Sequence, residues 1–402
     1  MLLKYERDID TLLQKMSLDE KIGQLNQMPW PSNEKQFEDY IKMIKDGKIG
    51  SIILTGSATS GKDDYNCSSV EKCNELQRIA VENSRNGIPL LFGLDVIHGH
   101  KTVLPIPLAS AASFNPELIE TCYHDIAEEA AADGIHWTFS PMVDMSRDPR
   151  WGRIVEGPGE DPYVGEKFAE ATVKGFQGID LADDNSVIAC AKHYIGYGAS
   201  EGGRDYHRTE ISDYSLYNYY LPAFKAAVNA GVGTIMSSFN DISGQPITSS
   251  RKYLTDILRG KLGFDGYVVS DWGSVQQLQK QGVAQDRKEC AKLALLAGLD
   301  MDMCSFCYKD NLKQLYESGE VSEEDINLAV RRILRLKYMK GLFDSPFTKE
   351  RQVDRKEHII NTKTLASESI VLLKNNDVLP LCKSSKIALL GPFAFEKRSL
   401  LG

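Results

Sequence analysis

The chain has 402 residues, of which 42% are hydrophobic and 26% are charged, so its composition is that of a folded globular protein and excludes general disorder. Its 47 Lys and Arg residues against 56 Asp and Glu residues give a net charge of -9 without a basic stripe, which argues against nucleic acid and anionic membrane surfaces as partners. The N-terminus becomes charged at once, and no apolar run approaches bilayer-spanning length, so we expect no membrane association and a cytoplasmic protein.

The eight cysteines are scattered over the chain, which favours reduced thiols over a disulfide framework. Cys304 and Cys307 form a C-x-x-C pair, but a zinc ribbon needs a second pair and the sequence has none. His98 and His100 lie on either side of one glycine, without an acidic or thiolate partner at an obvious spacing. We therefore expect neither a metal nor a cofactor.

Short apolar runs alternate with amphipathic stretches along most of the chain. The runs that we expect to be strands are 49–54, 88–95, 136–141, 187–193, 233–239, 264–271 and 298–303. The stretches that we expect to be helices are 10–25, 69–86, 116–133, 162–177, 216–229, 251–262 and 286–297. This alternation predicts an α/β fold with parallel strands and right-handed crossovers, in a closed barrel or a doubly wound sheet.

Polar and aromatic residues at the ends of different apolar runs favour the barrel. Asp95, Lys192, His193, Phe239 and Asp271 all stand at such ends, as expected when several strand ends converge on one mouth. A doubly wound sheet would instead concentrate ligand contacts at one switch point, usually with a Gly-rich phosphate loop, and no such loop is present. We expect a TIM-like (β/α)8 barrel.

The barrel is predicted to end with a helix that Ser322 begins and Gly341 ends. Residues 1–341 are then the barrel, and the charged, turn-rich residues 342–360 are a linker. Residues 361–402 contain a predicted helix at 361–374 and a predicted strand at 386–392, which are too few to complete a second core. We interpret them as the beginning of a second domain.

The residues at the strand ends suit a neutral, polyhydroxylated ligand, namely a sugar. Asp95 and Asp271 can accept hydrogen bonds from hydroxyl groups, and Lys192, His193 and Arg153 can donate them and hold the carboxylates ionised. Trp137, Trp151, Phe239 and Trp272 can offer flat apolar faces. The competing interpretations are that Asp271 only caps a helix, that His193 is a satisfied core residue and that the arginines lie in a solvated loop.

Several motifs occur in one order along the chain. They are Gly93-Leu94-Asp95-Val96-Ile97-His98-Gly99-His100, Arg147-Asp148-Pro149-Arg150-Trp151-Gly152-Arg153 with Gly159-Glu160-Asp161-Pro162, Ala191-Lys192-His193-Tyr194, Ser270-Asp271-Trp272, and Arg335-Leu336-Lys337 with Gly341-Leu342-Phe343. With these motifs the chain resembles the β-glucosidases of glycoside hydrolase family 3. The resemblance implies a retaining, exo-acting glycosidase with a TIM-like barrel followed by an α/β sandwich domain.

The resemblance also implies roles for individual residues. Asp271 takes the place of the nucleophile. The residues expected to bind the terminal sugar are Asp95, Arg153, Lys192, His193, Met236, Phe239 and Trp272. Many members have tyrosine where this chain has Phe239, a difference that removes one polar contact near the nucleophile. The expected ligand is a small-molecule β-glucoside or oligosaccharide; a β-xylosidase and an inactive sugar-binding module are the alternatives.

The general acid/base is the residue that the sequence does not supply. In β-glucosidases of the family it is a glutamate of the second domain, and neither Glu368 nor Glu396 lies in a matching motif. His207 stands in a loop of the β-glucosidase form and is expected to be an ordinary loop residue rather than the acid. We therefore expect the acid to come from outside this chain, with a homo-oligomer or a complementing C-terminal chain as possible partners.

Overall fold

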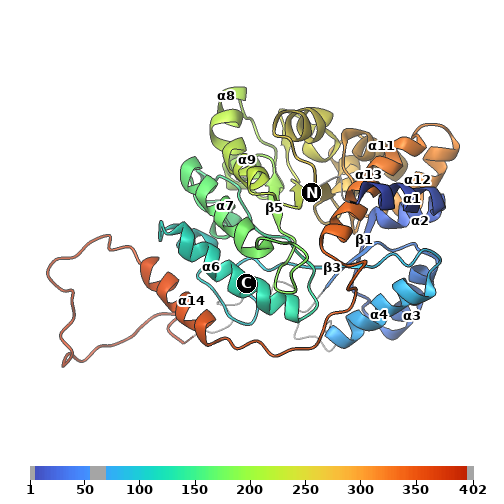
Figure 1. Cartoon of the computed structure of the whole chain (residues 1–402). Helices are drawn as coiled ribbons and strands as arrows, with labels where there is room; N and C mark the ends of the chain where they lie inside the picture. Colours follow the sequence, from blue (N-terminus) through green and yellow to red (C-terminus); the bar gives the residue numbers. More distant parts are fainter. Residues whose placement is uncertain (1–4, 55–68, 396–402) are drawn as a thin grey trace.

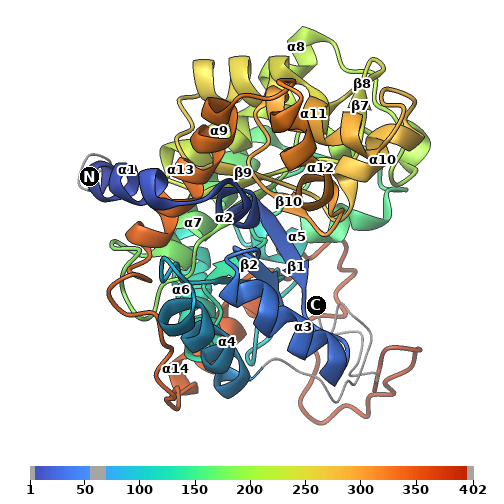
Figure 2. The same ribbon diagram turned by 90° about the vertical axis from the view of Figure 1, so that its right-hand side faces the viewer.

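The computed structural model describes residues 5–54 and 69–395, and a curled parallel sheet in two parts lies at its centre (Figure 1, Figure 2). One part has the order β10-β1-β2-β3-β4 and the other the order β5-β6-β9. The strands are β1 (Asn26–Pro29), β2 (Ser51–Ile53), β3 (Leu91–Leu94), β4 (Trp137–Thr138), β5 (Cys190–Tyr194), β6 (Thr234–Ser237), β9 (Tyr267–Ser270) and β10 (Asp302–Met303). The α/β class and the parallel arrangement are confirmed.

Isolated parallel pairs join the edge strands of the two parts. Trp137 of β4 pairs with Ile188 just before β5, and Val269 of β9 pairs with Met301 just before β10. A closed barrel requires contacts at both of these seams, because every strand of a barrel has two neighbours. A separate antiparallel hairpin, β7 (Asp241–Ile242) and β8 (Gln245–Pro246), follows β6.

Helices surround the sheet in both views (Figure 1, Figure 2). The α-helices are α1 (Glu6–Lys15), α2 (Leu18–Gln24), α3 (Glu34–Lys45), α4 (Val70–Asn83), α5 (Pro107–Ala111), α6 (Pro116–Ala132), α7 (Pro162–Gln177), α8 (Asp213–Ser215), α9 (Leu221–Asn229), α10 (Ser274–Lys280), α11 (Arg287–Ala297), α12 (Cys307–Glu317), α13 (Glu323–Met339) and α14 (Lys356–Glu368). Two π-helical segments, Leu216–Tyr220 and Lys252–Lys261, occur in stretches expected to be helical. The helix predicted to begin at Ser322 is α13, and Ser322 forms a capping box with Asp325 there.

The N-terminal region differs from the prediction of one helix at 10–25. Met16 is extended and Ser17 forms a capping box with Glu20, so the chain starts a new helix there. β1 was missed because it begins with the polar residues Asn26 and Gln27, which are nevertheless buried. α3 was missed because its buried stripe is narrow, with only Tyr40 and Ile44 fully inside.

The C-terminal region also needs correction. The strand predicted at 386–392 is absent from the described chain, which runs as an exposed irregular loop over 369–395 (Figure 1). A lone apolar run has no neighbouring strand to pair with and no partner face to cover it, so it gains nothing from extending. α14 begins at Lys356, inside the range expected to be linker, and packs on α6. No helix in the described residues is long and apolar enough to cross a membrane.

A buried lysine on α13 closes the end of the sheet where the strands begin. The Lys337 ammonium donates to Gln24 Oε1 (2.7 Å) and to the carbonyls of Gly50 (2.8 Å) and Pro89 (2.7 Å). Gly50 directly precedes β2, and Pro89 lies two residues before β3. Its side chain is completely buried, and burial lowers its pKa to about 7. One amino group thus donates to three acceptors that water cannot reach.

We expect Lys337→Met to lower the free energy of unfolding by about 2–4 kcal/mol, because three buried acceptors each lose a donor. Denaturant unfolding measures this change. The matched control is Lys313→Met, since the Lys313 side chain is 54% exposed and pairs only with Asp19; it should cost about 0.5 kcal/mol or less. Equal costs for the two variants would contradict the role assigned to Lys337.

Candidate active site

The ends of β3, β5 and β9 bring charged side chains to one rim of the sheet. Asp95 directly follows β3, Lys192 and His193 lie in β5, and Asp271 directly follows β9. All three strands are parallel, so these ends point the same way and their residues lie close together. β9 is buried along its whole length, which fixes the position of the residue that follows it.

Asp271 is buried, and its two carboxylate oxygens have different surroundings. Oδ1 accepts a hydrogen bond from the backbone N–H of Trp272 at 2.7 Å. Oδ2 is buried without a hydrogen-bond partner among the residues that the structure describes, and the nearest cation-forming atom is His193 Nε2 at 3.5 Å. Burying a carboxylate oxygen without a hydrogen-bond partner costs free energy. An unpartnered oxygen therefore indicates that Asp271 interacts with a ligand that the free protein does not contain.

Lys192 and Asp95 form an ion pair beside this carboxylate. The distance from Lys192 Nζ to Asp95 Oδ1 is 2.7 Å. The lysine side chain is 5% exposed and the aspartate side chain is 31% exposed, so the cation lies inside and the acid faces the opening. Asp95 therefore keeps free acceptor capacity toward a ligand.

Arg153 is held from both sides. Its Nε and Nη2 donate to Glu156 Oε1 (2.8 Å) and Oε2 (3.0 Å), and Nη2 lies 3.2 Å from His193 Nε2. Both Arg153 and Glu156 belong to the 3-10 turn Gly152–Glu156, whose three-residue spacing places them side by side. Burial lowers the pKa of Arg153, but the hydrogen bonds with Glu156 outweigh burial and leave it raised. The guanidinium is a fixed positive charge.

Burial is the largest influence on Asp271 and raises its pKa to about 6, although the charges of Arg153 and Lys192 act in the opposite direction. The sequence interpretation counted His193 as a third cation, and this is wrong. Burial and the charges of Arg153 and Lys192 lower the pKa of His193 well below its ordinary value, so the ring is neutral. Two cations, not three, favour ionised Asp271.

The three other residues predicted to bind the sugar lie nearby. Met236 is buried in β6, whose backbone pairs it with Val269 of β9. Phe239 lies after the end of β6 and packs against Tyr197, whose ring is 5.3 Å from the His193 ring. Trp272 is half exposed beside Asp271, as an aromatic platform for a ligand would be.

Sequence reasoning missed four residues that support this cluster. Tyr197 donates a hydrogen bond to Asp205, which also accepts one from Trp151, so these side chains fasten the loop after β5. Glu156 could have been found from its three-residue spacing to Arg153. Asp144, which contacts His193, lies three residues before a motif that was noticed, but its distance in sequence from His193 hides the contact.

The residues considered for metal binding make other contacts or lie at the start of a helix. His98 contacts the carbonyl of Leu104, and His100 pairs with Asp133 at 2.8 Å. Cys304 precedes α12, and Cys307 is the first residue of this helix. Across the described ranges, no three His, Cys, Asp or Glu side chains are grouped so as to hold a metal ion.

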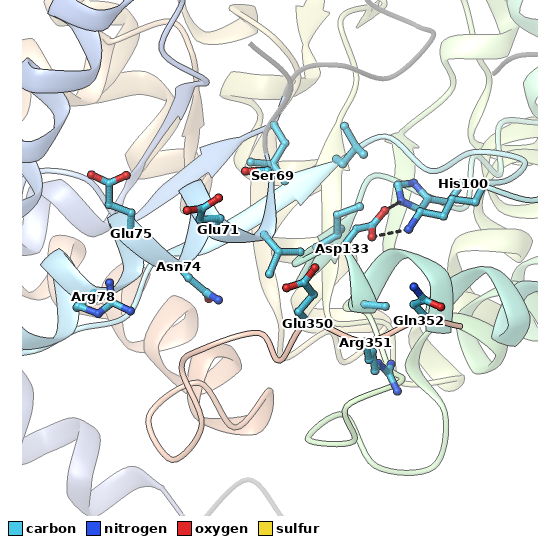
Figure 3. A pocket seen from close by; sticks show the side chains of 16 residues that line it. Ser69, Glu71, Asn74, Glu75, Arg78, His100, Asp133, Glu350, Arg351 and Gln352 are labelled. Carbon is cyan, nitrogen blue, oxygen red and sulfur yellow. Dashed lines mark hydrogen bonds and ion pairs between the residues drawn. The ribbon is translucent and has the colours of Figure 1, made fainter. Parts of the chain in front are cut away.

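A cavity of about 1270 Å³ lies elsewhere and is not this site (Figure 3). It is lined by residues of α4, the end of α6 and the segment after α13, among them Arg78, Asp133 and Arg351, with the His100–Asp133 pair at one side. None of the eight predicted site residues lines it. The volume of this cavity therefore does not locate the site. The convergence of charged groups at the strand ends locates it better.

Comparison with known proteins identifies the family of the chain. Residues 17–336 match the family described as the glycosyl hydrolase family 3 N terminal domain. The chain belongs to glycosyl hydrolase family 3. The motifs of the sequence predicted membership of this family, and the family match confirms that resemblance.

Relatives within family 3 include enzymes with two substrate names. The chain is 40% identical to the periplasmic beta-glucosidase of Salmonella typhimurium, over 98% of this chain and 51% of that protein. It is 36% identical to a putative beta-xylosidase of Formosa agariphila, over 97% of this chain and 54% of that protein. A crystal structure of beta-glucosidase from Listeria innocua in complex with glucose matches with a TM-score of 0.86 at 38% identity, over 94% of this chain and 54% of that one. The chain spans about half the length of these relatives.

The raised pKa of Asp271 makes a testable statement about stability. Its pKa is about 6 in the folded protein against an ordinary 3.8, so the folded state binds more protons between these values and loses stability as pH rises through them. We expect Asp271→Asn to raise the free energy of unfolding by about 1–3 kcal/mol at about pH 7.5, and by much less at about pH 4.

Denaturant unfolding of the parent chain and the variant at the two pH values measures this difference, in which the titrating groups remote from Asp271 cancel. Asp265→Asn is the matched control, because Asp265 is an exposed aspartate six residues earlier. It should show no such pH dependence. A stabilisation by Asp271→Asn that is equal at both pH values would mean that ionised Asp271 carries no cost.

Proposed function

We propose that this chain is the sugar-binding and nucleophile-bearing part of a retaining, exo-acting β-glucosidase. The observation that carries the proposal is the unpartnered, buried oxygen Oδ2 of Asp271, beside the two fixed cations Arg153 and Lys192. An attacking carboxylate needs a free lone pair and an environment in which it is ionised at neutral pH. With a pKa of about 6, Asp271 meets both conditions.

In this proposal Asp271 Oδ2 attacks the anomeric carbon of the terminal sugar, and the bond from that carbon to the leaving oxygen breaks. A proton donor gives its proton to the leaving oxygen, and water then hydrolyses the glycosyl-enzyme. Asp95 and Lys192 bind hydroxyl groups of the same sugar, while Trp272 and Phe239 offer it apolar faces. Hydrogen bonds of this kind help most when they strengthen in the transition state.

We propose further that the proton donor comes from outside this chain. The carboxyl groups around Asp271 already have other partners: Asp95 pairs with Lys192, Glu156 with Arg153, and Asp144 with His193. Glu368 ends α14 and accepts from Asn115, which caps α6, while His207 closes a turn in the loop after β5. Glu396 lies outside the described residues.

A β-xylosidase is the second candidate, because relatives with both names have similar identity to this chain. The curated beta-xylosidase of Formosa agariphila is 37% identical, close to the 40% of the periplasmic beta-glucosidase. Glucose is preferred here since the matching Listeria innocua beta-glucosidase structures contain glucose and laminaribiose. The ratio of kcat/KM for an aryl β-glucoside and the corresponding β-xyloside distinguishes the two substrates.

The proposed architecture follows the same resemblance. Residues 1–341 would form a TIM-like barrel closed at the two seams, 342–360 a linker, and 361–402 the beginning of an α/β sandwich. The parallel pairs at both seams support closure. A complementing C-terminal segment or chain, or a second copy, would then contribute the proton donor. The cytoplasmic location stays a prediction.

A mechanism-based reagent tests the nucleophile. We expect an activated 2-deoxy-2-fluoro-β-glucoside to add one fluoroglucosyl group to the peptide that bears Asp271. The fluorine slows both formation and hydrolysis of the glycosyl-enzyme, whereas the excellent leaving group restores only its formation, so the glycosyl-enzyme accumulates. Peptide mass spectrometry locates the added mass. Asp271→Asn should remain unlabelled and Asp265→Asn should be labelled like the parent chain. Label on Asp95 or Glu156 would refute the assignment, and absence of any label would favour a sugar-binding module.

The leaving group tests the origin of the proton. We expect the purified 402-residue chain to release an activated nitrophenol from its β-glucoside while cleaving cellobiose at least about 100-fold more slowly, because only cellobiose needs protonation of the leaving oxygen. Steady-state kcat/KM values for the two substrates give the comparison. Cleavage of cellobiose at a rate similar to that of the activated glucoside would show that this chain supplies its own proton donor.

A further inference from the structure

Behind His193 lies a buried carboxyl group that the proposed reaction does not use. Asp144 Oδ2 accepts from the backbone N–H of His193 at 2.9 Å and lies 2.8 Å from its ring atom Nδ1. The Asp144 and His193 side chains are each 1% exposed. Asp144 Oδ1 is buried without a partner among the residues that the structure describes. One oxygen of this carboxyl group therefore makes both contacts with His193.

The position of the single ring proton follows from counting donors and acceptors. Arg153 has only donors, so its Nη2, 3.2 Å from His193 Nε2, requires a lone pair on that ring nitrogen. The ring is neutral, since burial and two nearby cations lower its pKa well below the ordinary value. Its one proton must then be on Nδ1, from which it is donated to Asp144 Oδ2.

We propose that Asp144 is a positioning residue, which holds His193 in the tautomer protonated on Nδ1 so that Nε2 accepts from Arg153 instead of donating to Asp271. The distance of 3.5 Å between His193 Nε2 and Asp271 Oδ2 is then a contact without a hydrogen bond. This agrees with the lack of a partner at Oδ2 within the described ranges.

A proton on Nε2 would change two things at once. The ring would present a donor to the Arg153 guanidinium, which has no acceptor, and Arg153 would be pushed from its place. The same N–H could bond to Asp271 Oδ2 and make that oxygen a weaker base and nucleophile. This effect on Asp271 rests on the proposed function, whereas the tautomer itself does not.

The role requires an acceptor at the position of Oδ2 and does not require a full negative charge. Burial raises the pKa of Asp144 to about 7, so the group is partly protonated near neutral pH even in the parent protein. Asparagine can place its carbonyl oxygen where Oδ2 lies and its amide nitrogen where the unpartnered Oδ1 lies. Leucine fills a similar volume without any acceptor and leaves no room for a bridging water.

The experiment compares Asp144→Asn and Asp144→Leu with the parent chain by two measurements. Nitrogen-15 NMR of the histidine rings distinguishes a bare from a protonated nitrogen, with His193→Gln used to assign the signals. The rate of labelling by the 2-fluoro glucoside reports on Asp271. Asp148→Asn is the matched control, because Asp148 lies four residues away and bonds to Arg150 instead of His193.

We expect the parent chain and Asp144→Asn to show Nδ1–H and to be labelled at rates within about threefold of each other. In Asp144→Leu the proton should move to Nε2, and labelling should slow by about 10- to 100-fold, the loss typical when the group that orients a functional histidine is removed. Nε2–H in the parent chain overturns the proposal even if the leucine variant does not fold. Unchanged tautomer and labelling in a folded Asp144→Leu also overturn it. If the parent chain is not labelled, the proposed function fails while the tautomer assignment stands on the NMR result.

Discussion

The arrangement of the site depends on one electrostatic constraint. A buried carboxylate must stay ionised, while one of its oxygens must remain free of hydrogen bonds and ion pairs. Burial alone favours protonated Asp271, and direct pairing with a cation would occupy the oxygen that has to react. The structure meets both demands by placing Arg153 and Lys192 close enough to lower the pKa of Asp271 while each is held by another acid. Glu156 and Asp95 therefore act on Asp271 by restraining its cations.

The parallel fold makes this arrangement possible because it collects short polar segments from distant parts of the chain at one rim. Each segment is then secured by its own local device: a 3-10 turn for Arg153 and the buried strand β5 for Lys192. The opposite rim has a different chemistry. There Lys337 meets neutral acceptors, which satisfies the backbone at the strand starts and offers no carboxylate oxygen. The amino group of Lys337 therefore stabilises the fold, whereas the charged groups around Asp271 leave its oxygen Oδ2 without a hydrogen-bond partner among the described residues.

The sequence was informative wherever a residue type and a local pattern coincide, and less so where a contact is distant. The acid that ends the run at 264–271 and the Lys-His pair of β5 were predicted from their place after or within apolar runs, and the structure places both at one rim. β1 was not recognised, since its polar residues are buried by tertiary contacts that no periodicity reveals. Asp144 was not recognised because it meets His193 only in three dimensions. The strand at 386–392 was predicted from composition, but a strand needs a partner.

The same electrostatics bears on where a proton donor could be placed. A general acid must hold its proton near neutral pH, so it needs a neighbouring negative charge or burial, away from fixed cations. Glu156 has the opposite environment, because Arg153 lowers its pKa in spite of its burial. In the proposed function, a carboxyl group from another segment would lie close to Asp271 across the scissile bond, and the negative charge of Asp271 would raise its pKa. In the proposed function, division of the two carboxyl groups between separate parts of the protein would let one stay ionised and the other stay protonated. Asp144, the buried carboxyl group at this rim whose pKa is raised to about 7, is already engaged with His193.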